Sequence, residues 1–183
     1  APETARRIRR DGRRGIVVRP RLRVLQKKSA PVHESLKVCE VIQEILTLAR
    51  SSLDGVTLET QLDPQLPQVR GDRVQLQQVL LNLVVNASDA MKPVTDRPRT
   101  LRIEAGRNTS GDVEVAVRDS GTGLPPDLLE KVFSTFFTTK SDGLGMGLAI
   151  CRSIMEQHGG RLWAESNPDH GATFRFTLPV ENS

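Results

Sequence analysis

The residues best suited to chemistry lie between Asp119 and Gly147. Alternating glycines open and close this stretch, and they are Gly121 and Gly123, then Gly143, Gly145 and Gly147. Because glycine lacks a Cβ, it permits positive φ angles and lets the backbone approach a ligand closely. The second cluster begins a predicted helix over residues 144–158, whose first N–H groups would face an anion. Taken alone, this cluster fits a phosphate-binding loop and an ordinary flexible loop before a helix.

A second candidate region is an apolar helix predicted over residues 71–91, with Asp72 placed to cap its start. Apolar side chains cover most of its circumference, so we expect burial nearly all round. Four polar residues at spacings of four, four and three share one face: Gln78, Asn82, Asn86 and Asp89. An unsatisfied polar group in a dry core costs about 1–3 kcal/mol. The stripe should therefore line a cavity with water, an ion or a ligand, unless it bonds neighbouring backbone.

Together these segments resemble four ordered motifs of sensor histidine kinases. Residues 77–91 are similar to the Asn box, 119–123 to the first glycine box, 133–140 to the phenylalanine box and 143–148 to the second glycine box. The resemblance covers about residues 31–180, and the kinases of nitrogen regulation, dicarboxylate sensing and oxygen sensing form the most similar subgroup. It implies a catalytic ATP-binding domain with the fold of gyrase, the Hsp90 chaperones and MutL.

Hydrophobic periodicity predicts the elements that would position these motifs. We expect an amphipathic helix over 35–50, a strand over 56–62, a proline-broken loop over 63–72, hairpins over 100–119 and 161–178, and a charged loop over 92–100. Helices on one face of a mixed, mostly antiparallel sheet give a two-layer α/β sandwich. The stretch between the glycine clusters would form a mobile ATP lid.

Asp119 is the candidate for base recognition, since it ends a predicted strand just before glycines. An ionised carboxylate accepts hydrogen bonds but donates none. Adenine offers an amine donor where guanine offers a carbonyl oxygen, so Asp119 would favour ATP over GTP. Thr173 resembles the threonine that assists adenine recognition in the family. The plainer interpretations are an Asp that begins a turn and an ordinary strand Thr.

The resemblance implies that Asn86 contacts Mg²⁺ directly. One amide oxygen suits Mg²⁺, which completes its octahedron with phosphates and water. Asn82 and Asp89 would support that site, and Lys140 would meet the outer phosphates as a point charge. A solvated lid lysine is the alternative for Lys140. The glycines Gly121, Gly123, Gly143, Gly145 and Gly147 would act as hinges and phosphate-facing backbone.

One position separates phosphoryl transfer from hydrolysis. ATP-hydrolysing relatives carry Glu four residues before the magnesium asparagine, where it activates water as a general base. Asn82 stands there, and an amide cannot take that proton. We therefore expect the γ-phosphate of ATP to be kept for a histidine. The chain has three histidines: His33 in the predicted hinge, His158 at the end of a predicted helix and His170 in a predicted hairpin turn. None lies in a dimerisation hairpin, so the acceptor is expected outside this chain.

Composition fits an intracellular domain. Residues 1–28 have a net charge of +9 in a chain of +4, so the other 155 residues carry −5. Residues 1–30 are interpreted as the basic end of the dimerisation hairpin plus a hinge, and 31–183 as the catalytic domain. Nucleic-acid binding by the tail is disfavoured, because it has no aromatic residue for base stacking. We predict no membrane contact by this chain, a cytoplasmic location and two unpaired cysteines, Cys39 and Cys151.

The partners implied by the resemblance are a His-bearing dimerisation domain and a response regulator, with a homodimeric parent. Two other functions stay open on the residues. A stand-alone ATPase of the gyrase type would release phosphate rapidly, and a non-catalytic nucleotide-binding or nucleic-acid-binding module would do neither reaction.

Overall fold

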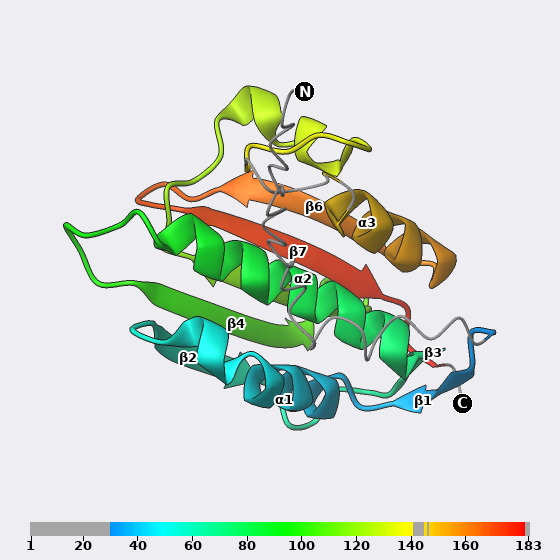
Figure 1. The fold of residues 1–183 in the computed structure, drawn as a ribbon. Helices are drawn as coiled ribbons and strands as arrows, with labels where there is room; N and C mark the ends of the chain where they lie inside the picture. Colours follow the sequence, from blue (N-terminus) through cyan, green and yellow to red (C-terminus); the bar gives the residue numbers. More distant parts are fainter. Residues whose placement is uncertain (1–29, 141–144, 146, 182–183) are drawn as a thin grey trace, which may run out of the picture.

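The chain forms a five-stranded sheet with helices on one face, as the computed structural model shows (Figure 1). The structure describes residues 30–140, 145 and 147–181. The strand order is β2-β4-β5-β7-β6. The bounds are β2 Thr57–Leu62, β4 Thr100–Arg107, β5 Val113–Asp119, β6 Arg161–Ser166 and β7 Ala172–Leu178. Only β2 and β4 pair in parallel, so the predicted mixed, mostly antiparallel sheet is confirmed.

Three α-helices of the described residues pack on the same face of this sheet (Figure 1). They are α1 Val38–Leu48, α2 Arg73–Met91 and α3 Gly147–Gln157. Short 3₁₀ turns are η2 Arg50–Leu53, η3 Pro126–Leu128 and η4 Lys131–Phe133. Alternate residues of β4, β5 and β7 meet the helices in one apolar core. The predicted two-layer α/β sandwich is therefore confirmed.

Helix α2 lies between α1 and α3 and contacts both, so it is the central helix of its layer. The Asp72 carboxylate accepts the Gln75 N–H at 2.9 Å, which satisfies one of the free donors at the helix start. Most of the apolar residues of α2 pack in the hydrophobic core. Val74 is exposed, so the expectation of burial nearly all round was too strong at the first turn.

A second, two-stranded sheet was missed by the sequence analysis. β1 His33–Leu36 pairs antiparallel with β3 Val69–Asp72, where a hinge and a proline-broken loop were expected. Each strand has only four residues, and three of the four in β1 are exposed, so neither gives a clear alternating pattern.

The hairpins predicted over 100–119 and 161–178 are confirmed. Gly111 turns the first one with a φ of +90°. No helix among the described residues is long and apolar enough to cross a membrane. The expectations for residues 1–29 and for Gly143 lie outside the described residues.

Candidate functional site

Asp119 ends β5 with its side chain on the helix face of the sheet, and it is only 3% exposed. Its Oδ1 accepts the N–H of Gly121 at 2.8 Å and the N–H of Ala172 at 3.3 Å. Burial raises the pKa of this carboxyl above its ordinary value, although the two backbone N–H groups act to lower it. A carboxyl at this position is costly to ionise, which is typical of a functional group.

The second oxygen of Asp119, Oδ2, differs from Oδ1 in its contacts. Within the described part of the chain, both hydrogen bonds to this carboxyl are made by Oδ1. No fully buried side-chain oxygen among the described residues lacks a hydrogen-bond partner, so Oδ2 faces a space that solvent reaches. The arrangement can therefore accept a hydrogen bond from outside the protein.

Two residues that the sequence analysis missed hold Asp119 from the β6–β7 turn. Asn167 donates to the Asp119 carbonyl at 3.0 Å. Gly171 has a φ of +80°, and a Cβ there would lie 2.1 Å from that same carbonyl oxygen. Only glycine fits this close approach. An asparagine and a glycine that flank a turn are common in sequences, so no signal distinguished these two in advance.

Thr173 is buried, but the structure does not place its side chain beside the Asp119 carboxylate. Successive strand side chains alternate between faces. Ala172 and Phe174 face the helices, whereas Thr173 and Arg175 face the other side of the sheet. The Thr173 hydroxyl donates to Asn167 Oδ1 at 2.6 Å. Its link to Asp119 is thus indirect, and its direct contact with a base stays a prediction.

Three of the predicted residues converge on one point beside α2. The Lys140 ammonium donates to Asn86 Oδ1 at 3.0 Å and to Asp89 Oδ2 at 2.7 Å. Lys92 also pairs with Asp89, at 2.6 Å. Burial acts to raise the pKa of Asp89, but the hydrogen bonds from Lys140 and Lys92 outweigh it and hold the pKa below its ordinary value. Two oxygens one helix turn apart thus share a cation.

Asn82 lies on the same stripe, next to α3. Its amide Nδ2 donates to Cys151 Sγ at 3.3 Å, and a Cβ on Gly147 would lie 3.9 Å from its amide group. Burial raises the pKa of the Cys151 thiol to about 11, although the Asn82 bond acts to lower it, so the thiol stays protonated. Asn82 therefore positions the start of α3 against α2.

The described glycines of the two clusters meet different parts of the chain. Gly121 packs on α2, where a Cβ would lie 2.6 Å from the Ala90 carbonyl oxygen. Gly123 and Gly145 have φ angles of +79° and +67°. A Cβ on Gly145 would lie 2.5 Å from the carbonyl carbon of Phe136, which itself has a φ of +65° and is 75% exposed. This backbone can adopt its path only with glycine at these positions.

The two halves of the site lie along one helix. Asn86 and Asp89 belong to the last turns of α2, and the next residue, Ala90, accepts the Thr122 N–H through its carbonyl. The loop after Asp119 and the side chain of Lys140 therefore both contact the C-terminal end of α2.

The chain is similar to sensor histidine kinases. The sensor histidine kinase TmoS of Ectopseudomonas mendocina is 38% identical over 98% of this chain and 19% of TmoS. The sensor protein FixL of Bradyrhizobium diazoefficiens is 49% identical over 74% of this chain and 26% of FixL. The chain thus spans between a fifth and about a quarter of these relatives.

Solved structures show the same fold. The nucleotide-free catalytic domain of the histidine kinase ThkA matches with a TM-score of 0.70 and 35% identity, over 81% of this chain and 98% of that domain. ThkA in complex with the response regulator protein TrrA matches with a TM-score of 0.69 and 31% identity, over 88% of this chain and 48% of that one. Residues 71–182, which contain all the predicted site residues, match one family over more than half of the chain. The chain belongs to the histidine kinase-, DNA gyrase B-, and HSP90-like ATPases, and within them it has the sequence and fold of a sensor histidine kinase's ATP-binding catalytic domain.

Proposed function

We propose that this chain binds ATP with Mg²⁺ and supplies the γ-phosphoryl group for a protein-histidine kinase reaction. The observation that carries the proposal is the Asp119 carboxylate, which is buried, fixed through Oδ1 and open at Oδ2. An acceptor in this state suits the exocyclic amine of adenine and disfavours the carbonyl oxygen of guanine. A charge-assisted hydrogen bond of roughly 1.5–3 kcal/mol would favour ATP over GTP about tenfold or more.

Asn86 would hold Mg²⁺ through its amide oxygen. Support comes from the convergence of Asn86 Oδ1 and Asp89 Oδ2 on the Lys140 ammonium, because these oxygens already share one positive charge. Mg²⁺ prefers such hard oxygen ligands and takes few of them from protein. When bound, the ion would neutralise part of the phosphate charge. Lys140 would leave Asn86 and contact the outer phosphates.

Asn82 favours transfer over hydrolysis. Its amide has no basic group, and its nitrogen is engaged with Cys151. Asp89 is the remaining group of this helix face that could act as a base. Its carboxylate is paired with Lys140 and Lys92, so it is poorly suited to activate water beside the γ-phosphate.

The acceptor histidine would come from another domain. Both ring nitrogens of His158 are hydrogen-bonded and its side chain is buried, so it is unfit as an acceptor. His33 lies on β1 and His170 in the β6–β7 turn, so both belong to the catalytic domain rather than to a dimerisation hairpin. A hairpin in cis or from a second subunit would supply the acceptor, in a homodimeric parent whose catalytic domain lies in the cytoplasm; support comes from the similarity to sensor histidine kinases that are much longer than this chain. The ThkA–TrrA complex supports a response regulator as the next partner.

The domain division follows from this proposal. Residues 31–183 would be the catalytic domain, with Gly121, Gly123, Gly143, Gly145 and Gly147 framing a lid over the phosphates. Residues 1–30 would be the end of the dimerisation hairpin, without a nucleic-acid or membrane role.

One incubation tests the proposal. The chain is mixed with Mg²⁺ and γ-labelled ATP, with and without a separately produced His-bearing hairpin from the parent kinase. We expect acid-labile label on the hairpin and little free phosphate. Rapid release of free phosphate without label would replace the kinase by an ATPase. Neither product, in the presence of a competent hairpin, would leave only a binding module.

A further inference from the structure

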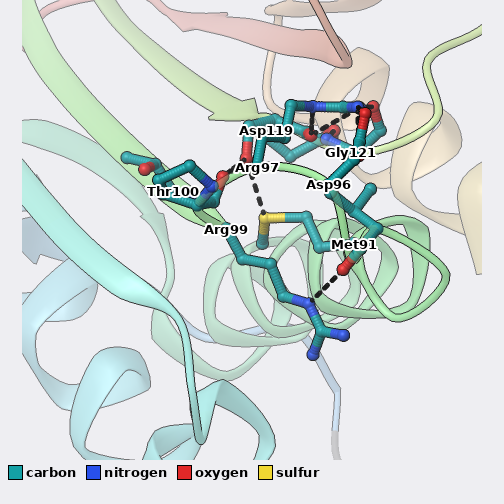
Figure 2. Close-up of polar contacts among 10 residues, drawn as sticks. Met91, Asp96, Arg97, Arg99, Thr100, Asp119 and Gly121 are labelled. Atoms are coloured by element: carbon teal, nitrogen blue, oxygen red, sulfur yellow. Dashed lines mark hydrogen bonds and ion pairs between the residues drawn. The ribbon is translucent and has the colours of Figure 1, made fainter.

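The loop between α2 and β4 was predicted only as a charged connection. Its residue Arg97 contacts Ser120 and Gly121, which directly follow Asp119 (Figure 2). The Arg97 guanidinium donates to the Ser120 carbonyl from Nε at 3.3 Å and from Nη2 at 3.2 Å. Nη2 also donates to the Gly121 carbonyl at 2.8 Å. The side chain is only 22% exposed, so water screens these charge-assisted bonds weakly.

The peptide that Arg97 contacts is the one that fixes Asp119. The carbonyl of Ser120 and the N–H of Gly121 belong to the same peptide group. Arg97 binds the carbonyl end, and the N–H end donates to Asp119 Oδ1 at 2.8 Å. Hydrogen bonds in series polarise one another, so a cation on the carbonyl strengthens the donor at the other end.

Several other contacts immobilise this peptide from the sides. Ser120 Oγ accepts the Thr100 N–H at 2.8 Å, and the Thr122 N–H donates to the Ala90 carbonyl at 3.1 Å. Gly121 itself has no room for a side chain against α2. Among the described residues, the Arg97 guanidinium is the one cation that contacts the Ser120–Gly121 peptide.

The charged groups nearby do not replace Arg97. Asp96 accepts from Arg97 Nη1 at 3.0 Å and is exposed, so it orients the guanidinium without cancelling its contacts to the loop. Arg118, the neighbour of Asp119 on β5, faces the other side of the sheet and pairs with Asp169. Arg99, two residues after Arg97, donates back to its own loop at Val94 and Lys92.

We propose that Arg97 is a positioning residue for nucleotide recognition, which holds and polarises the Ser120–Gly121 peptide so that Gly121 orients the Asp119 carboxylate. The inference rests on the proposed role of Asp119 in binding adenine. Arg97 itself would not touch the nucleotide.

The first test needs no nucleotide. Amide hydrogen exchange at Gly121 is measured by NMR in the full chain, in Arg97→Met and in Arg99→Met. The last variant removes the same charge from the same loop. We expect exchange at Gly121 to be about tenfold faster in Arg97→Met and within about twofold of the parent in Arg99→Met. Unchanged exchange in Arg97→Met, or equal acceleration in both variants, would overturn the proposal.

The second test compares ATP with ITP, whose base carries a carbonyl oxygen where adenine has its amine. We expect Arg97→Met to weaken ATP binding about five- to tenfold and to leave ITP binding unchanged, so that the ratio of the two affinities falls. An equal loss for both nucleotides would mean that Arg97 only supports the fold, and would overturn the proposal.

Arg97→Lys keeps the test decisive if Arg97→Met does not fold. It retains the charge but cannot bind two carbonyls with one planar fork, so both readouts should lie between the parent and the expected loss. If Arg97→Lys kept the parental ratio of ATP to ITP affinity and the parental exchange rate at Gly121, the requirement for a guanidinium that binds both carbonyls would be wrong. Asp119→Asn distinguishes failure of the proposed function from failure of this inference. An unchanged ratio of ATP to ITP affinity in Asp119→Asn would refute the adenine contact, whereas amide exchange at Gly121 tests the role of Arg97 independently of any nucleotide.

Discussion

The Asp119 carboxylate is held where burial disfavours its charge, and this has a cost for the fold. Its pKa is raised, so ionisation costs more free energy in the folded chain than in the unfolded chain. The linked contribution to stability is fully present below the unfolded pKa and is lost as pH rises through the folded pKa. Whenever Asp119 is ionised, its charge is better solvated in the unfolded chain, so the ionised group lowers the free energy of unfolding.

Asp119→Asn should separate function from stability. We expect its free energy of unfolding at pH 8 to equal or exceed that of the parent chain, and the advantage to shrink as pH falls below the raised pKa of Asp119. ATP affinity should fall about tenfold or more, because the amide is uncharged. Urea unfolding across pH and calorimetric ATP titration measure both. Strong destabilisation at pH 8 would show that Asp119 is mainly structural.

At the scale of elements, the lid segment contacts α2 through Lys140, whose ammonium lies on the oxygens proposed for Mg²⁺. Lys140→Met should weaken ATP binding about fivefold relative to AMP, since only ATP carries the outer phosphates and Lys140 is partly exposed. Calorimetry with both nucleotides measures this ratio.

Lys92→Met is the matched control for the lid prediction. It removes the other cation on Asp89 but lies at the end of α2 rather than in the lid segment. The ATP-to-AMP ratio should stay at the parental value. If the ratio of ATP to AMP affinity falls equally in the two variants, Lys140 acts through Asp89 and not on the phosphates.

His158 joins the end of α3 to the start of α2. One ring nitrogen, Nδ1, contacts the Ile154 carbonyl at 2.7 Å, and Nε2 accepts the Asp72 N–H at 3.0 Å. Nδ1 must therefore carry the proton, which fixes a neutral tautomer. The His33 ring lies against the His158 ring, with their centroids 5.2 Å apart and their planes tilted by 38°, so β1 joins the same junction.

His158→Ala should lower the free energy of unfolding by about 1–3 kcal/mol, because it leaves the buried Asp72 N–H without an acceptor. Urea unfolding measures the loss. His170→Ala, in the exposed turn, should stay within about 0.5 kcal/mol of the parent chain. ATP affinity should not change in either variant, since this junction lies at the opposite end of α2 from Asn86. Equal effects of both substitutions would contradict the role assigned to His158.

At the scale of the whole molecule, sequence predicts the parts whose pattern is periodic. Asn86 and Asp89 share a helix face by spacing alone, and the long alternating strands β4 and β5 lead to Asp119. Arg97 and Asn167 could not be predicted, because their partners depend on how two loops fold back onto one strand end. The orientation of Thr173, in contrast, could have been predicted. Side chains alternate along a strand, so a residue next to the core residue Phe174 faces away from the core.

Residues 1–28 have a net charge of +9, whereas the family match begins at residue 71 and the described residues at residue 30. A chain of residues 30–183 should therefore keep its thermal midpoint and its ATP affinity. Saturating Mg²⁺ and ATP should stabilise both chains equally, by about 2.7 kcal/mol at a hundredfold excess over Kd. Thermal unfolding with and without nucleotide measures this. Loss of the nucleotide effect in the shorter chain would place part of the binding site in the basic tail, and would reopen a binding role for it.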